Sequence, residues 1–172
     1  MNNLIVREAK QADADAIATI HVQTWQCAYR GQIPDEYLAN LSIEKRKQFW
    51  SEATSKPHDK SRILVAELDG EVAGFCGGGP SRDEDADKTI GEVYSIYIDQ
   101  NKMGRGAGTA LMKNILTFLK DQGFVKVTLW VLSTNQITKR FYKNHGWKPD
   151  GKTKSEINKG ITFNEERYII DL

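Results

Sequence analysis

Short runs of the chain that alternate apolar and polar residues, or are rich in apolar ones, predict β-strands with at least one buried face. These runs are residues 4–9, 62–68, 71–77, 90–98, 126–132 and 162–171. Asp69-Gly70 separates the second run from the third, and this dipeptide suits the positive φ angles of a type I′ turn. We therefore expect a β-hairpin at this point of the chain.

Between these runs, apolar residues recur at the three- and four-residue spacing of a helix with one buried face. The longest such segment covers residues 106–122, and a shorter one covers residues 136–144. Asp13 and Ser42 are residue types that favour helix N-caps, so a helix is expected after each of them, with a short helical turn after Pro34.

Two polar stretches interrupt this pattern after the predicted hairpin. Gly77-Gly78-Gly79-Pro80 and the acidic run at residues 83–87 are expected to form a surface loop. The acidic run has the charge to attract a polyamine or another cation, although runs of like charge are more often simply solvated.

Strands and helices follow one another in mixed order, without an internal repeat or an interdomain linker. One twisted, mostly antiparallel sheet of about six or seven strands, with helices on both faces, accounts for this order. The sequence therefore predicts an α+β fold in a single domain spanning residues 1–172.

Composition and charge exclude several functional classes. The chain is 40% hydrophobic and 27% charged, as in ordinary globular proteins, and its net charge of +1 gives no reason to propose a nucleic-acid partner. Cys27, Cys76, His21, His58 and His145 lack the spacings of metal sites or disulfide frameworks, so no metal is expected. Without a signal-peptide core or an apolar run of ~20 residues, a cytoplasmic protein with no membrane partner is favoured.

A glycine-rich segment lies between the strand expected at 90–98 and the helix expected from 106. Its residues are Met103, Gly104, Arg105, Gly106, Ala107, Gly108 and Thr109. Free N–H groups at a helix start carry partial positive charge, and glycine lets a diphosphate approach the backbone, so a phosphate-bearing ligand is inferred. The dinucleotide fingerprint would need glycine at Thr109, and the P-loop pattern is absent. A tight turn with ordinary helix packing is the alternative.

The segment resembles the coenzyme A pyrophosphate loop of the GNAT superfamily of N-acetyltransferases. The family pattern, Gln/Arg-x-x-Gly-x-Gly/Ala, falls on Met103, Gly106 and Gly108, with methionine in place of the polar residue. A second family block is matched about 30 residues further on by Asn135, Phe141, Tyr142, Gly146 and Trp147, with Thr138 where alanine is usual. Residues 21–38 resemble a branch of small bacterial members.

The resemblance implies that acetyl-coenzyme A is the acetyl donor, with its pyrophosphate on the glycine loop. It also implies a bulge that splays the strand at 90–98 from its neighbour, so that the pantetheine arm pairs with the segment Ile96, Tyr97 and Ile98 like an added strand. The backbone N–H of Ile98 would then stabilise charge on the thioester oxygen. Asn135 would hydrogen-bond the pantetheine amides, and the alternative is that it caps the following helix.

Transfer to an amine with a pKa near ~10.4 requires a base, because such an amine is mostly protonated at neutral pH. By resemblance this base is Glu92, acting directly or through water; the alternative is a solvated strand carboxylate paired with a lysine. The resemblance also makes the Tyr142 hydroxyl the proton donor to the departing thiolate, against a half-buried aromatic with its hydroxyl in solvent.

Trp25, Tyr29 and Tyr37 fall where the family builds its acceptor pocket, and aromatic faces attract ammonium groups. Ordinary helix packing explains these aromatics as well. The acceptor, a small-molecule or peptide amine, is left open among polyamines, amino acids, amino sugars, peptide amino termini and protein lysines. A homodimer is compatible with the sequence. The rival functions are a catalytically silent module that senses acyl-coenzyme A, and a nucleotide-binding domain.

Overall fold

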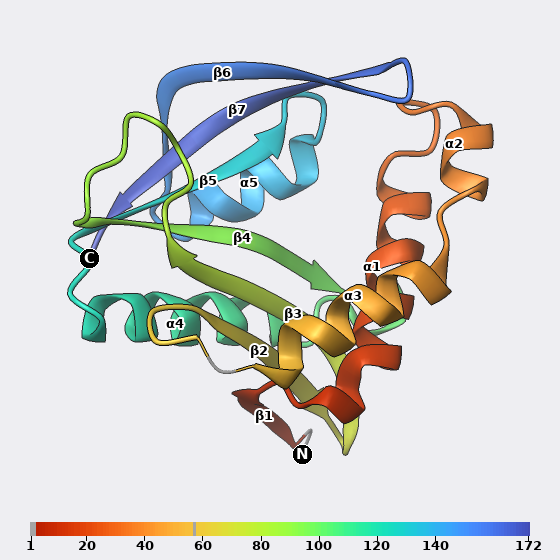
Figure 1. Cartoon of the computed structure of the whole chain (residues 1–172), viewed down its shortest axis with the longest axis horizontal. Coiled ribbons are helices and arrows are strands. Elements are labelled where there is room, and N and C mark those ends of the chain that lie inside the picture. The colour runs from red at the N-terminus through yellow and green to blue at the C-terminus, as the bar shows by residue number, and fades with distance from the viewer. Residues whose placement is uncertain (1–2, 57) are drawn as a thin grey trace.

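The computed structural model describes residues 3–56 and 58–172, which form a seven-stranded sheet in the order β1-β2-β3-β4-β5-β7-β6 (Figure 1). The strands are β1 (Leu4–Glu8), β2 (Arg62–Leu68), β3 (Glu71–Pro80), β4 (Ile90–Ile98), β5 (Lys126–Leu132), β6 (Lys148–Asn158) and β7 (Ile161–Asp171). Neighbouring strands are antiparallel except β4 and β5, which are parallel. The predicted α+β architecture with a mostly antiparallel sheet is confirmed.

Helices cover both faces of the sheet, as expected (Figure 1). They are α1 (Ala14–Ala28), α2 (Asp35–Ala39), α3 (Ile43–Ser55), α4 (Ala107–Asp121) and α5 (Gln136–Asn144). The apolar stripe of α4 is buried against one face, in a cluster that includes Leu111, Ile115 and Leu119. On the other face α1 and α3 contact each other and cover Val65 and Phe75. The sheet is therefore the middle layer, with apolar contacts on both sides.

The hairpin between β2 and β3 turns at the predicted dipeptide. Asp69 has a φ of 54° and Gly70 a φ of 88°, and Leu68 pairs directly with Glu71. Positive φ angles at both central residues are those of a type I′ turn. The local prediction is confirmed.

Of the two predicted N-caps, Ser42 is confirmed and Asp13 is not. The Ser42 hydroxyl accepts a hydrogen bond from the Lys45 amide at 3.2 Å at the start of α3. Asp13 precedes α1 but makes no side-chain cap to it. Its carboxylate instead accepts from the Lys10 amide at 2.7 Å and from the Arg7 guanidinium at 2.7 and 2.9 Å. A strong charged donor nearby therefore draws the carboxylate away from the helix end.

The stretch Gly77-Gly78-Gly79-Pro80 was expected to break the chain, and that expectation is wrong. β3 continues through it and pairs with β4 as far as Pro80 and Gly91. A Cβ atom added to Gly78 would lie 2.9 Å from Cγ1 of Ile115 on α4. Gly78 and Gly79 therefore allow neighbouring groups to approach the strand more closely than a side chain would permit, whereas Gly77 has room for a Cβ atom.

Strand β6 was missed by the sequence analysis. It forms the edge of the sheet, pairs only with β7, and is interrupted between Pro149 and Thr153. Its sequence, KPDGKTKSEIN, has almost no apolar residue, because only one neighbouring strand and no helix layer requires a buried face. The tip of the β6–β7 hairpin reaches α2, where Tyr37 and Phe163 belong to one apolar cluster (Figure 1).

Strands β4 and β5 separate part-way along their length. They pair from Ile90 to Glu92 on β4 and from Lys126 to Thr128 on β5, and no further pairs join them in the described structure. The pairing of β3 with β4 shifts at the same level, since Gly78 faces Val93 and Gly77 faces Ser95. Tyr94 is thus the extra residue of a β-bulge, which bends the strand. The sequence analysis expected this bulge only by resemblance, and it lies where the site is built.

The close packing at Gly78 leads to a test of the fold. Gly78→Ala is expected to lower the free energy of unfolding by about 1 to 3 kcal/mol, because the new methyl group overlaps Ile115. Gly77→Ala is the matched control, since its nearest atom is Oγ of Ser95 at 3.5 Å, an ordinary contact. Urea unfolding of both variants measures the difference. Equal losses in the two variants would contradict the proposed overlap.

Candidate functional site

The glycine loop leads into the start of α4, where the first backbone amides have no hydrogen-bond acceptor within the helix. Gly104 and Gly106 have φ angles of 74° and 89°, and Gly106 is the N-cap of α4 without a side-chain cap. The first helical hydrogen bond runs from the Ala110 amide to the Gly106 carbonyl at 3.0 Å. The amides of residues 107–109 therefore have no acceptor within the helix, and together they form a place for an anion.

A cleft with a volume of about 960 Å³ opens where β4 and β5 separate. Eleven of the residues predicted for the site line it: Trp25, Tyr29, Tyr37, Glu92, Ile96, Tyr97, Ile98, Met103, Gly108, Asn135 and Tyr142. The other loop residues do not line it within the described structure: Gly104, Arg105, Gly106, Ala107 and Thr109. The cleft thus joins the loop end of β4 to the aromatic residues of α1 and α2.

The backbone of β4 offers hydrogen-bonding groups to this cleft. The Asp99 amide donates to the Ala73 carbonyl on β3 at 2.8 Å. Because alternate residues of a strand direct their backbone groups to opposite sides, Ile96 and Ile98 direct theirs toward β5, where pairing has stopped. The Ile98 carbonyl accepts the Thr24 hydroxyl at 3.3 Å. The segment is thus able to pair with an extended ligand.

Tyr142 of α5 presents its hydroxyl at the cleft. Its side chain is 5% exposed, and its ring lies against Phe141, Trp147 and Tyr168. Desolvation raises the pKa of Tyr142 well above its ordinary value, so the group keeps its proton. The alternative of a half-buried ring with its hydroxyl in solvent is wrong. A buried, protonated phenol is suited to donate a proton.

Glu92 lies at the level where the two strands part. It is 2% exposed, and Arg82 holds both of its carboxylate oxygens: the Arg82 amide donates to Oε2 at 2.9 Å, and Nη2 donates to Oε1 at 2.6 Å. The alternative of a solvated carboxylate paired with a lysine is therefore wrong, because the group is buried and its partner is an arginine. Any proton that Glu92 accepts must reach it past this ion pair.

Asn135 performs the capping role that was the alternative for it. Its Oδ1 accepts the Thr138 amide at 3.2 Å at the start of α5, while the residue also lines the cleft. With the oxygen engaged, the amide nitrogen is the part that can bind a ligand. Gly146, with a φ of 86°, follows α5, and Trp147 is buried beneath Tyr142.

The aromatic end of the cleft is built from α1, α2 and β7. Trp25 Nε1 donates to the Tyr97 hydroxyl at 3.1 Å, and its ring meets Tyr29 edge-on at a centroid distance of 5.0 Å. Tyr37 and Trp25 both contact Phe163, at centroid distances of 6.0 Å. Burial raises the pKa of Tyr29, which stays neutral. The three predicted aromatics do gather at one place.

Several charged residues of the cleft escaped the sequence analysis. They are Arg46, Arg82, Lys154, Glu156 and Glu165. Arg46 lies on α3, Arg82 in the loop after β3, Lys154 and Glu156 on β6, and Glu165 on β7, so no common spacing along the chain links all five. Only the tertiary fold brings them together.

The acidic loop is not simply solvated, contrary to expectation. Asp83 and Asp85 receive hydrogen bonds from Nη1 of Arg167 at 3.0 and 2.8 Å, and Asp150 receives one from its Nε at 2.7 Å. Arg167 lies on β7 and its side chain is nearly buried. Its charge lowers the pKa of Asp85. The loop is therefore fixed to the sheet beside the cleft.

His21 of α1 supports the aromatic wall from behind. Its ring stacks on Tyr97 at 5.0 Å, and its Nδ1 accepts the Trp50 indole N–H at 3.1 Å. Burial first, and then the nearby charge of Arg46, lower the pKa of His21 to about 4. The imidazole is therefore neutral at physiological pH.

Among residues 3–56 and 58–172, no group of three or more His, Cys, Asp or Glu side chains is arranged to hold a metal ion. None of the helices in the described parts of the chain has the length and apolarity needed to cross a bilayer.

Comparison with known proteins gives consistent results. A family model described as the acetyltransferase (GNAT) family matches residues 5–147. The uncharacterized N-acetyltransferase YuaI of Bacillus subtilis is 35% identical over 131 residues, which cover 76% of this chain and 72% of that protein. An N-acetyltransferase structure from Staphylococcus aureus Mu50 superposes with a TM-score of 0.75 at 24% identity, covering 98% of both chains.

A further structural relative is the paia N-acetyltransferase from Thermoplasma acidophilum, solved in complex with coenzyme A. It superposes with a TM-score of 0.73 at 16% identity and covers 99% of both chains. At this identity the likeness supports the fold.

The neutral His21 makes stability depend on pH. Its pKa is lower in the folded chain than the 6.5 of the unfolded chain, so the unfolded state binds more protons as the pH falls. The free energy of unfolding should therefore fall by roughly 3 kcal/mol between about pH 7 and pH 4 through this group.

His21→Gln keeps an acceptor for Trp50 but does not titrate. Urea unfolding of both proteins at several pH values should show a shallower acid loss in the variant, while the other titrating groups remain common to both. Parallel pH profiles would show that the imidazole is not the group responsible.

Proposed function

The chain belongs to the acetyltransferase (GNAT) family, and we propose that it transfers an acetyl group from acetyl-coenzyme A to a primary amine of a small molecule or peptide. The reaction is direct attack of the amine within a ternary complex. The observation that carries this proposal is the cleft between β4 and β5, which reaches from an uncapped helix start to an aromatic pocket. The cytoplasmic location, the single domain and a homodimer stay predictions.

The donor end of the cleft fits acetyl-coenzyme A, which supplies the reactive acetyl thioester. The free amides of residues 107–109 suit its pyrophosphate, with Met103 and the positive-φ glycines Gly104 and Gly106 shaping the loop. Met103 stands where the family pattern has a polar residue, and it is 55% exposed. We therefore assign binding of the pyrophosphate to the backbone amides of the loop. Arg105 is paired with Asp69 at 2.9 Å and holds the loop in place.

The middle of the cleft suits the pantetheine arm and the thioester. The backbone groups of Ile96 and the N–H of Ile98, on either side of Tyr97, are available for strand-like hydrogen bonds, while the Ile98 carbonyl accepts the Thr24 hydroxyl. The Ile98 N–H is the proposed donor to the thioester oxygen as negative charge develops there. Asn135 contributes its amide nitrogen from the opposite side.

Two side chains are proposed to move protons. Tyr142 gives its proton to the departing thiolate, a role supported by its place in the cleft and by the burial that keeps its phenol protonated. Glu92 takes the proton of the attacking amine, and because Arg82 holds both carboxylate oxygens, we place a water molecule between the amine and the carboxylate. Trp25, Tyr29 and Tyr37 form the proposed acceptor wall.

The rival function is a catalytically silent module that senses acyl-coenzyme A. Such a module would use the same glycine loop but would need no proton donor. It is not favoured, because the family and the relative that covers most of the chain are named for acetyl transfer. A nucleotide-binding domain is not favoured for the same reason.

Free thiol release from acetyl-coenzyme A, measured across a panel of amines, tests the function directly. We expect release that depends on the amine, together with a rise in melting temperature with acetyl-coenzyme A but not with NAD or ATP. Ligand at about 100 times its Kd should stabilise the chain by about 2.7 kcal/mol. Stabilisation without release on the whole panel would contradict the transferase, and no stabilisation would contradict coenzyme A binding.

Tyr142→Phe is expected to lower kcat for thiol release by about 100-fold. General acids contribute about 10²- to 10⁴-fold, and a thiolate with a pKa near ~8.5 departs tolerably without help, so the lower end applies. Tyr168→Phe removes a hydroxyl from the same buried cluster, but within the described structure Tyr168 does not line the cleft, and the variant should keep its activity. Similar losses in both variants would point to packing instead of proton transfer.

A further inference from the structure

Most charged side chains that line the cleft are already paired. Arg82 holds Glu92 at 2.6 Å, and Lys154 contacts both Glu156 and Glu165 at 3.2 Å. Arg46 differs from them. Arg46 is a half-buried residue that lines the cleft, yet in the part of the chain that the structure describes its guanidinium has no ion pair and donates no hydrogen bond. This cation is thus available to a ligand.

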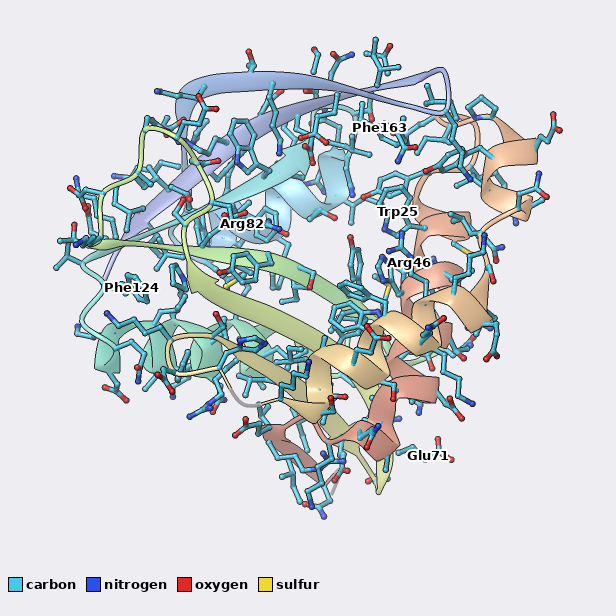
Figure 2. All side chains as sticks on the ribbon, in the orientation of Figure 1. Trp25, Arg46, Glu71, Arg82, Phe124 and Phe163 are labelled. Atoms are coloured by element: carbon cyan, nitrogen blue, oxygen red, sulfur yellow. The ribbon has the colours of Figure 1, made fainter. Side chains whose placement is uncertain are left out.

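The position of Arg46 places it at the acceptor end. It lies on α3 one turn before Trp50, and residues four apart share a helix face. Burial lowers the pKa of His21 and raises that of Tyr97, and the charge of Arg46 is a smaller influence on both groups, as expected of a cation near the aromatic wall. Figure 2 labels Arg46 on α3, Trp25 on α1 and Phe163 on β7 on the same side of the molecule, and all three line the cleft. All three contribute to the acceptor end, away from the glycine loop.

The wall of the cleft that faces Arg46 is formed by β6 and β7 and carries negative charge. Glu165 on β7 and Glu156 on β6 share the single ammonium group of Lys154. The charge of Glu165 raises the pKa of Tyr97, whereas that of Arg46 lowers it, so both groups act on the same hydroxyl. Among the residues that line the cleft, the acceptor end therefore has a cation on the α3 side and two carboxylates to one ammonium on the β6–β7 side. The Lys159 ammonium lies behind this lining, 5.9 Å from the centroid of the Tyr37 ring. An acceptor with an ammonium group and a carboxylate is complementary to this arrangement.

We propose that Arg46 binds a carboxylate of the acceptor, and that the acceptors are amino acids or closely related amino-carboxylates. This inference rests on the proposed acetyl transfer and narrows its substrate class. A guanidinium matches a carboxylate with two parallel hydrogen bonds, which gives both affinity and orientation. Polyamines and amino sugars lack the anionic group and leave Arg46 unpaired.

The test compares amino acids with their carboxamides as acceptors in the thiol-release assay, with spermidine and glucosamine alongside. Wild-type protein should prefer the carboxylate forms. Arg46→Gln should lower kcat/KM for them by about 10- to 100-fold, mainly through KM, because one charge-assisted contact is lost. The same variant should leave the carboxamides, and the KM for acetyl-coenzyme A, nearly unchanged.

Lys45→Gln is the matched control, because Lys45 is an exposed cation on the neighbouring position of α3 and does not line the cleft within the described structure. It makes the same change of charge and should behave as wild type. Equal losses for acids and amides in Arg46→Gln, or equal losses in the two variants, would overturn the inference. So would wild-type protein that acetylates spermidine, glucosamine or the amides as well as the acids.

The two proposals fail differently. Thiol release with amines that lack a carboxylate, and no preference for those that have one, removes the role of Arg46 and leaves the transferase intact. Absence of release with every amine removes both, while the melting-temperature shift still reports whether acetyl-coenzyme A binds.

Discussion

The separation of β4 from β5 is the constraint on which the rest of the structure depends. The bulge at Tyr94 turns β4 away after Glu92, so that the interior of the sheet contains backbone groups without a strand partner. Buried backbone groups require hydrogen bonds, and an extended ligand provides them in the way that an added strand would. The cleft is therefore a product of the sheet itself, and the helices and loops around it determine only what its two ends accept.

Ion pairs fix the loop between β3 and β4 beside this cleft. Arg82 joins the loop after β3 to Glu92, and Arg167 joins the same loop to β7 through Asp83 and Asp85. Glu92 and Arg167 are the buried partners of these pairs, while Arg82 and Asp85 are partly exposed. The pairs therefore satisfy two buried charges at the surface of the sheet. The loop is thus fixed to β4 and to β7, and its residues are poorly placed to adapt to different acceptors.

Local chemistry explains which parts of the fold were predictable from the sequence. The Asp69-Gly70 turn and the stripe of α4 depend on residues adjacent in the chain or one helical turn apart, and both were predicted. The glycines at 77–79 resemble a chain break in the sequence, because the side chains that pack against Gly78 and Gly79, those of Ile115 and Ser61, are distant along the chain. Strand β6 could not be predicted, since an exposed edge strand has no apolar face to show.

The same distinction applies to the site. The glycine loop is one continuous segment, and its resemblance to a known loop could be read directly from the sequence. The cation of Arg46 could not be found in this way, because its neighbours in the cleft come from α1 and β7. Arg46 and Arg82 are the same residue type, and they differ because Arg82 forms an ion pair with Glu92. Ion pairing between distant residues is a property of the folded chain.

The contrast between the two ends of the cleft has a consequence for specificity. The donor end relies on backbone groups, which do not change when side chains are replaced. The acceptor wall is neutral at physiological pH, because burial lowers the pKa of His21 and raises that of Tyr29. Selection by charge is therefore left to Arg46 and to the carboxylate pair around Lys154. A chain of this fold can thus change its acceptor by substituting a few such side chains, while binding of the acetyl donor is maintained.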